Sequence, residues 1–237
     1  MRFPGSAVID VVCWDWNGTL LDDAAVALGA MNTVLHEHGL PVLPHVEAYR
    51  SVFGFPVRDF YARLGISDQD FRAAAGRYLE LFASRVGQAR LHPDAVATLS
   101  GLGRLGVAQV LISATVADVL ERQMAPHPVA SHFDQILGIT DAYAPSKADV
   151  VATWLRSSGH DPRRVLMIGD TNHDEEIAEE LGLHLVRFSR GHQDPPDHDR
   201  HAVVGRLGDV VELVRASRRH LEAPPGPGRP PDGTSTS

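Results

Sequence analysis

The hydrophobic and polar positions divide the chain into two kinds of pattern. Residues 7–15 read AVIDVVCWD, a short β-branched and apolar run that predicts a buried strand. From about residue 24 to residue 88, apolar residues recur at helical spacing and no run indicates a strand. The first predicted helix there stops at Gly39, which Pro41 follows. The pattern therefore predicts a helical segment that begins directly after the first strand.

From about residue 93 the predicted helices and strands alternate. The predicted strands lie at 107–113, 133–140, 163–170 and 183–189. The predicted helices lie at 93–106, 114–124, 147–159 and 174–182. Strands separated by helices are typical of a parallel sheet with helices on both faces. We therefore expect an α/β fold with a Rossmann-like parallel sheet.

This alternation also predicts the organisation of the chain. We expect residues 1–21 and 91–221 to form the α/β core, with the helical segment 22–90 inserted after the first strand. Residues 222–237 are rich in Pro, Gly, Ser and Thr and nearly without apolar side chains. Such a segment cannot offset its ordering entropy by burial, so we expect a disordered tail.

Composition narrows the classes of partner. Lys and Arg total 22 against 30 Asp and Glu, a formal net charge of −8, which does not suit nucleic-acid binding and does suit a divalent cation. The single cysteine, Cys13, excludes an internal disulfide framework and fits a small core residue. There is no signal-peptide pattern and no apolar run near the ~18 residues of a membrane span. We expect a cytoplasmic protein that binds neither nucleic acid nor membrane.

Polar signatures follow three of the predicted strands. They are residues 15–19, 113–115 and 170–174, and Lys147 opens a helix between the last two. Ligands of open parallel sheets bind at the carboxyl ends of the strands, so we expect these segments to meet at one edge.

The residue types in these segments favour phosphoryl chemistry. Asp15, Asp170 and Asp174 offer the oxygen ligands that Mg²⁺ prefers. Asp15 can attack phosphorus as a carboxylate nucleophile and form an aspartyl-phosphate. Ser113 and Lys147 can hold the oxygens of the transferring group, where negative charge has to be balanced.

The motifs DWNGTL, LISAT, SK and GDTNHD occur in this order and resemble those of the haloacid-dehalogenase superfamily. The similarity is to its phosphoglycolate-phosphatase-like branch, with D-x-D-G-T-L, Ser or Thr, Lys, and G-D-T-x-x-D, and it covers residues from about 8 to 215. The resemblance implies Mg²⁺-dependent hydrolysis of a small phosphomonoester by a monomer or homodimer, and it makes residues 22–90 a cap domain. It implies metal binding by Asp15, the Asn17 carbonyl, Asp170 and Asp174.

Further residues are candidates for contacting the substrate. Gly18 permits a tight turn and close backbone approach to a phosphate. A cap that opens and closes fits a small phosphomonoester rather than a protein side chain. The candidate contacts are Gly18, Thr19 and Ala114 in the core, and Arg50, Arg58 and Tyr61 in the cap.

The sequence departs from the family pattern at Asn17, where the phosphatases carry an Asp that works as acid and base. An amide can neither give nor take the proton, and such catalysis typically contributes ~10²–10⁴-fold. Several interpretations stay open: a slow phosphatase, a substitute base such as His173, His192 or a substrate group, or a phosphotransferase or mutase with a long-lived Asp15 phosphate. A binding protein and deamidation of Asn17 to an aspartate are further alternatives.

Overall fold

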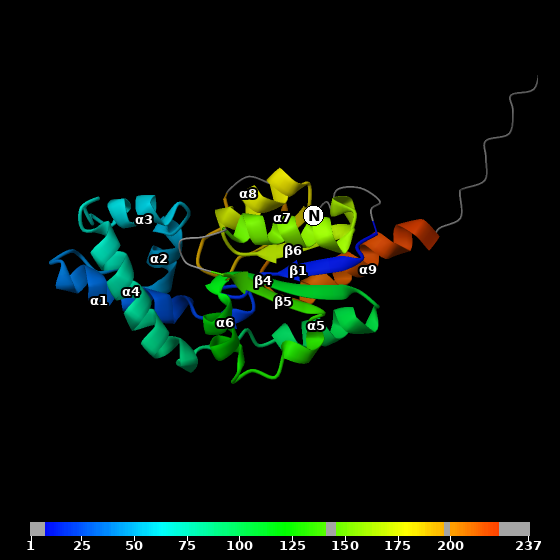
Figure 1. The fold of residues 1–237 in the computed structure, drawn as a ribbon, viewed down its shortest axis with the longest axis horizontal. Coiled ribbons are helices and arrows are strands. Elements are labelled where there is room, and N and C mark those ends of the chain that lie inside the picture. The colour runs from blue at the N-terminus through cyan, green and yellow to red at the C-terminus, as the bar shows by residue number, and fades with distance from the viewer. Residues whose placement is uncertain (1–7, 141–145, 197–199, 223–237) are drawn as a thin grey trace, which may run out of the picture.

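The computed structural model describes residues 8–140, 146–196 and 200–222. The sheet runs through the middle of the core domain, with helices on both faces and a helical cap beyond one end of the strands (Figure 1). Of the predicted disordered tail, residues 222–237, only Glu222 belongs to the described residues, and the rest lies outside them. Within these residues no helix is long and apolar enough to cross a membrane.

The main sheet has six parallel strands in the described part of the chain, in the order β5-β4-β1-β6-β7-β8. Their bounds are β1 (Val11–Trp14), β4 (Ala108–Val116), β5 (Gln135–Ile139), β6 (Val165–Gly169), β7 (His184–Phe188) and β8 (Ala202–Val204). The central strand β1 pairs with both β4 and β6. The predicted α/β fold with a parallel sheet is confirmed.

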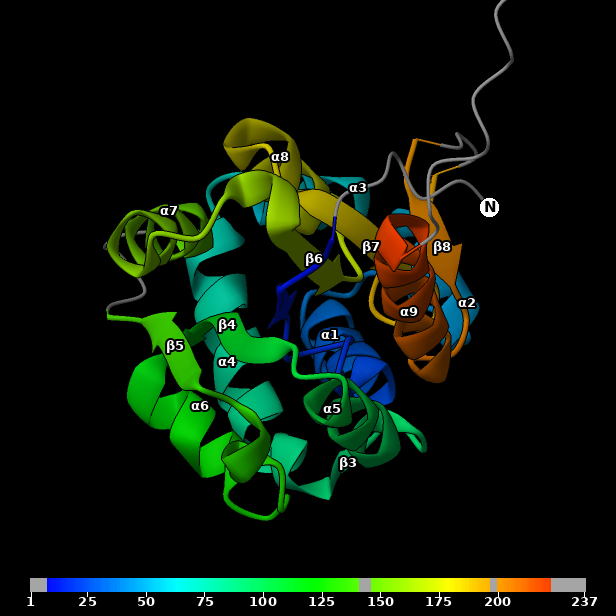
Figure 2. The ribbon, with the colours of Figure 1, turned by 90° about the vertical axis from the view of Figure 1, so that its right-hand side faces the viewer.

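Successive residues of β1 are buried on opposite faces of this sheet, as the apolar run predicts. Val12 and Trp14 pack in one cluster with α5 (Ala95–Arg104), α6 (Ala117–Met124) and α9 (Gly208–Glu222). Val11 and Cys13 pack in the other with α7 (Lys147–Ser158) and α8 (Asn172–Leu181). Figure 2 shows the two helical layers on either side of the strands. Short 3₁₀ turns occupy Val86–Gln88, Ala130–His132 and Pro162–Arg164.

Four helices form the cap: α1 (Ala24–Glu37), α2 (Val46–Val52), α3 (Val57–Arg63) and α4 (Phe71–Arg85). They share a hydrophobic core of their own, in which Leu35, Tyr49 and Phe60 are buried. Two short antiparallel strands, β2 (Leu21–Asp22) and β3 (Arg90–Leu91), join the cap to the sheet domain. All four helices lie within the segment for which the sequence predicts a helical insertion.

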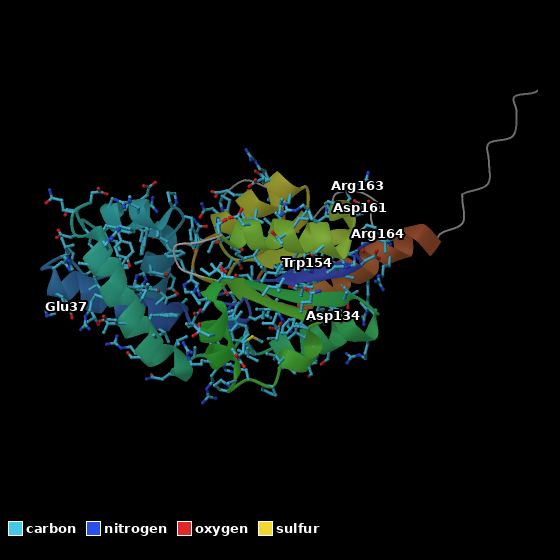
Figure 3. The ribbon with its side chains drawn as sticks, viewed as in Figure 1. Glu37, Asp134, Trp154, Asp161, Arg163 and Arg164 are labelled. Atoms are coloured by element: carbon cyan, nitrogen blue, oxygen red, sulfur yellow. The ribbon has the colours of Figure 1, made fainter. Side chains whose placement is uncertain are left out.

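The end of the sheet remote from the cap carries exposed ion pairs. Figure 3 shows Asp161, Arg163 and Arg164 gathered there, far from Glu37 at the outer end of the cap. Arg163 bonds Asp161 at 3.0 Å, and Arg164 donates to Asp10 at 2.8 Å. Exposed pairs of this kind contribute little to stability. The polar groups suited to binding and catalysis lie at the other end of the sheet, beneath the cap.

Candidate active site

Trp14, the last residue of β1, pairs with Leu111 of β4 and Ile168 of β6, so the segments that follow these three positions begin at one edge of the sheet. Asp15 directly follows β1, Ser113 lies in the last part of β4, and Asp170 directly follows β6. The start of α7 adds Lys147. Asp15, Ser113 and Lys147 line one pocket of about 90 Å³ together with Asn17, Ala114 and the cap residue Phe55. Asp170 lies beside this pocket, with a carboxylate oxygen within 4.8 Å of those of Asp15 and Asp174. The structure thus brings together the segments for which the sequence predicts a shared edge.

A buried lysine ties two of the carboxylates together. Lys147, only 4% exposed, donates through Nζ to Asp174 Oδ1 at 2.6 Å and to Asp15 Oδ1. Burial opposes its charge, but the Asp15 and Asp174 carboxylates outweigh burial and raise the pKa of Lys147. For Asp174, burial is likewise outweighed by Lys147, and its pKa is lowered. The site therefore holds a permanent ammonium beside a carboxylate that stays ionised.

Asp170 is fixed by hydrogen bonds from two other loops, and Asp174 by hydrogen bonds from Thr171 at the start of its own helix. Thr19 Oγ1 donates to Asp170 Oδ1 at 2.9 Å, and the His192 backbone N–H donates to Oδ2 at 2.6 Å. Thr171 donates to Asp174 Oδ2 through its backbone N–H at 3.0 Å and through Oγ1 at 2.9 Å. Thr19, a candidate phosphate contact in the sequence, is fully buried and orients a carboxylate instead. Asp174 serves both the start of α8 and the site.

The three carboxylates fit a small hard cation. Oxygen atoms of Asp15, Asp170 and Asp174 all lie within 4.8 Å of one another. Burial, with the Asp174 and Asp170 charges, raises the pKa of Asp15 to about 8 although Lys147 acts in the opposite direction. The single Lys147 ammonium thus does not offset the burial and mutual repulsion of the three carboxylates. Carboxylate oxygens in such an arrangement are the donors that Mg²⁺ takes.

Asn17 does not extend its side chain freely into this pocket. Its amide Nδ2 donates to Asp23 Oδ2 at 2.7 Å and to Gln123 Oε1 at 3.3 Å. Its Oδ1 accepts from Thr115 Oγ1 at 2.9 Å. Asp23, which the sequence does not single out, is fully buried. Two adjacent acidic residues, Asp22 and Asp23, end the motif GTLLDD and could have drawn attention to this position. Nothing in the sequence pattern shows that the Asp23 side chain turns inward.

The two histidines proposed as substitute bases differ in their surroundings. His192 has both ring nitrogens engaged, Nε2 with Asp23 Oδ1 at 3.0 Å and Nδ1 with the Tyr49 hydroxyl at 3.1 Å. Burial disfavours its charge, but Asp23 outweighs burial and raises the pKa of His192 to about 9. His173 lines the same pocket and stacks on Phe55 with ring centroids 4.8 Å apart. Burial lowers the pKa of His173.

The cap contacts the core next to the pocket. Arg50 donates from Nε to the Gly191 carbonyl at 2.7 Å and from Nη2 to the Arg190 carbonyl at 2.6 Å. Phe55 and Asn172 exchange two hydrogen bonds, of 2.8 and 2.9 Å. Arg50, a candidate substrate contact, thus binds the loop after β7. Its guanidinium joins cap to core here.

Two other cap candidates lie away from the pocket, which corrects the expectation that they face it. Arg58 forms an ion pair with Asp68 and lies 4.5 Å from the centre of the Phe71 ring, with its side chain 56% exposed. Tyr61 is 4% exposed and packs edge-on against Phe60 and Phe71 in the core of the cap. Helical spacing alone could not show which face of α3 turns toward the site.

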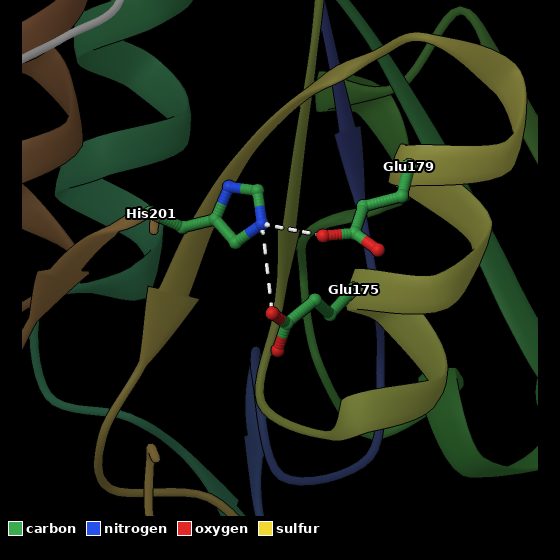
Figure 4. A group of neighbouring side chains, drawn as sticks. All are labelled: Glu175, Glu179 and His201. Atoms are coloured by element: carbon green, nitrogen blue, oxygen red, sulfur yellow. Dashed lines mark ion pairs between the residues drawn. The ribbon is translucent and has the colours of Figure 1, made fainter. Parts of the chain in front are cut away.

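A second group of acidic residues and a histidine lies between α8 and the segment before β8 (Figure 4). His201 Nε2 is 3.6 Å from Oε1 of both Glu175 and Glu179, which lie one turn apart on α8. These ion pairs connect the segment before β8 to α8. None of these three residues is among the candidates from the sequence.

A parallel sheet with a carboxylate and lysine site at its carboxyl edge, beneath a helical cap, defines a capped α/β enzyme. Residues 12–188 match the family model described as "Haloacid dehalogenase-like hydrolase". The chain therefore belongs to the haloacid dehalogenase-like hydrolase family. The predicted family and the prediction of a hydrolase of its phosphatase type are confirmed.

Curated and solved relatives agree with this family. The tyrosine-protein kinase PtkA of Mycobacterium tuberculosis is 26% identical over 210 residues, covering 87% of this chain and 72% of PtkA. A phosphoglycolate phosphatase of Caulobacter vibrioides is 26% identical over 194 residues, covering 78% and 81% of the two chains. The structure of a haloacid dehalogenase-like hydrolase from Streptococcus pneumoniae superposes with a TM-score of 0.72 at 22% identity, covering 86% of this chain and 98% of that one. At that identity the superposition shows the fold alone.

Proposed function

We propose that the protein hydrolyses a small phosphomonoester, with Mg²⁺, through an aspartyl-phosphate on Asp15. The observation that carries the proposal is the bridge from Lys147 to Asp15 and Asp174, with Asp170 beside them and Ser113 in the same pocket. The relative from Caulobacter vibrioides is named a phosphoglycolate phosphatase, which supports the same class of substrate.

The residues divide the work as follows. An Asp15 carboxylate oxygen attacks phosphorus, and the bond from phosphorus to the ester oxygen breaks as the Asp15–phosphate bond forms, with the leaving oxygen taking its proton from water. Ser113 and Lys147 lie in the same pocket and hold the phosphoryl oxygens as charge develops on them. Bound by Asp15, the Asn17 carbonyl, Asp170 and Asp174, Mg²⁺ would supply charge neutralisation at the phosphate. Water then attacks the phosphorus of the aspartyl-phosphate, the bond from phosphorus to Asp15 breaks, and inorganic phosphate and the Asp15 carboxylate are released.

The size of the pocket supports a small substrate. With the cap in contact with the core, the pocket beside Asp15 measures about 90 Å³. A larger hollow of about 620 Å³ lies along α6 and β5, but none of the site carboxylates lines it. We therefore place the phosphate beside Asp15, with Phe55 and His173 forming the wall on the side of the cap.

Release of inorganic phosphate from a set of small sugar and organic-acid phosphates tests the proposal. With Mg²⁺ the native protein should release phosphate, and Asp15→Asn should lose at least about 10³-fold in rate, because the nucleophile is gone. Chelation of the metal should abolish release. Asp22→Asn, which changes a neighbouring half-exposed carboxylate, should stay close to the native rate. Equal rates for the native protein and Asp15→Asn would refute the proposal.

A second candidate is transfer of the phosphoryl group from Asp15 to a hydroxyl acceptor. It is favoured by the Asn17 amide, which supplies no base to activate water. The relative named tyrosine-protein kinase PtkA points in the same direction. Following labelled phosphate from the substrate distinguishes the two. Label recovered as free phosphate supports hydrolysis, whereas label that moves to an added polyol or tyrosine peptide supports transfer.

A further inference from the structure

We propose that Asp23 is a positioning residue of this site and that it determines which residue position 17 can hold. On this inference Asn17 is the required partner of a buried carboxylate at Asp23. Its bearing on catalysis rests on the proposed function, whereas the pairing itself rests on geometry alone.

The side chain of Asp23 turns away from the helix that it precedes. Asp23 is the N-cap residue of α1, a position where Asp usually accepts from the helix backbone, yet within the described residues it makes no such capping bond. It accepts instead from the Gly18 backbone N–H at 2.8 Å, Asn17 Nδ2 at 2.7 Å and His192 Nε2 at 3.0 Å. The missing capping bond indicates that the carboxylate is held by the site instead.

Three donors meet this one carboxylate, which is 0% exposed. A buried charge is tolerated only when its oxygens are fully hydrogen-bonded and paired. The donors come from two separate loops, Asn17 and Gly18 after β1 and His192 after β7. Asp23 therefore joins the loop that carries the nucleophile to the loop that meets the cap.

Only an amide fits opposite Asp23 at position 17. Asn17 donates to Asp23 with Nδ2 and accepts from Thr115 with Oδ1, so both ends of the amide are used. An aspartate there would place two acceptor oxygens, and two like charges, about 2.7 Å apart in a buried setting. An ionised carboxylate at position 17, where the family pattern has an Asp, is thus disfavoured as long as Asp23 is present.

The pair reaches the reacting groups through short connections. Thr115, which bonds Asn17, donates its backbone N–H to Ser113 Oγ at 3.1 Å. On the other side, His192, which bonds Asp23, also forms a hydrogen bond with the Tyr49 hydroxyl of the cap. Asp23 is not among the residues that line the pocket of Asp15, so it acts by positioning the loop after β1 and the Ser113 hydroxyl.

Four variants test the pairing: Asn17→Asp, Asp23→Asn, the double exchange Asn17→Asp with Asp23→Asn, and Asp22→Asn as the matched control. The melting temperature should fall by roughly 5–10 °C in each single variant of the pair. The double exchange should recover at least half of that loss, because the amide introduced at position 23 can again donate to the carboxylate introduced at position 17. Asp22→Asn, with a half-exposed side chain, should melt near the native temperature.

Phosphate release by the same proteins gives the second readout. Asn17→Asp alone should be slower than the native protein, and the double exchange should exceed Asn17→Asp by at least tenfold in kcat. Asn17→Asp that melts like the native protein, or single effects that merely add in the double exchange, would overturn the pairing. If Asn17→Asp does not fold, folding of the double exchange supports the pairing and its failure to fold overturns it.

The melting-temperature measurements are repeated with Asp15→Asn added to each variant, a background in which no turnover is expected. Recovery by the double exchange there supports the pairing whatever the reaction is. Persistence of phosphate release in Asp15→Asn refutes the proposed function and leaves the melting result standing. The two failures are therefore distinguishable.

Discussion

At Gly18 the loop after β1 passes so close to its neighbours that a side chain has no room. Its φ is +77°, and an added Cβ would lie 2.3 Å from Asp170 Oδ2 and 2.5 Å from His192 Cδ2. Gly39 offers a matched control, since its φ is +67° and no atom lies within 4 Å of an added Cβ.

Gly39→Ala should therefore lower the free energy of unfolding by about 1–2 kcal/mol, which is the cost of placing a side chain on a left-handed backbone conformation. Gly18→Ala should lose that and about 1–3 kcal/mol more, because the close contact displaces Asp170 and His192. Urea denaturation measures both, and Gly18→Ala should also lose phosphate release. Equal losses in the two variants would mean that the close approach at Gly18 is relieved without strain.

The same scale shows which residues a sequence can predict. Asp15, Ser113, Lys147 and Asp170 could be brought together from the sequence because the first, second and fourth follow or close a predicted strand, Lys147 opens a helix, and parallel strands end at one edge. The strand β4 in fact continues past Ser113 to Val116. The Asn17–Asp23 contact could not be predicted, because the direction of a side chain at a helix start is decided by packing between segments far apart in the sequence. The prediction that Arg58 faces the pocket was wrong for a related reason, because the guanidinium pairs with Asp68 on the exposed surface of the cap instead.

Among the elements, those with long apolar patterns were predictable and the short polar ones were not. The helix α2 buries only Tyr49, so no apolar repeat marks it in the sequence. Its start is fixed by His45, whose Nδ1 accepts from the Ala48 N–H at 3.1 Å. The strand β8 spans Ala202–Val204, too short a run to show a pattern.

The short helix α2 nevertheless sets the contact between cap and core. Arg50 binds two carbonyls of the loop after β7, and Asp194 N donates back to the Arg50 carbonyl at 3.2 Å. Arg50→Ala removes two charge-assisted bonds, each worth about 1.5–3 kcal/mol at most. We expect KM for a small phosphate ester to rise about tenfold with a smaller change in kcat, since the closed cap is less populated.

Arg58→Ala is the matched control for that experiment, because it removes a cap arginine that bonds no core residue among those described. Its steady-state constants should stay within about twofold of native, as for an exposed ion pair. Limited proteolysis of the two variants gives an independent readout, with faster cleavage expected only for Arg50→Ala. Similar KM changes in both would show that the contact of α2 with the loop after β7 does not govern closure.

In the whole molecule, the parallel sheet brings three carboxylates to one edge, and the repulsion between them lowers the stability of the folded state. Asp15, Asp170 and Asp174 are all 8% exposed or less, and Lys147 neutralises only part of their charge. A cation bound by the folded site and not by the unfolded chain would stabilise the fold by mass action. At 100 times Kd that stabilisation is about 2.7 kcal/mol.

Mg²⁺ should therefore raise the melting temperature of the native protein by roughly 5–10 °C at saturation. Asp170→Asn should lose most of this rise, because it removes one charge from the shared donor set. Asp118→Asn, which alters an exposed carboxylate paired with Arg122 on α6, should keep it. The shift needs no turnover, so it tests the metal separately from the reaction. An equal rise in all three proteins would assign the effect to general ionic screening, since a site formed by the strand ends has to lose its cation when Asp170 loses its charge.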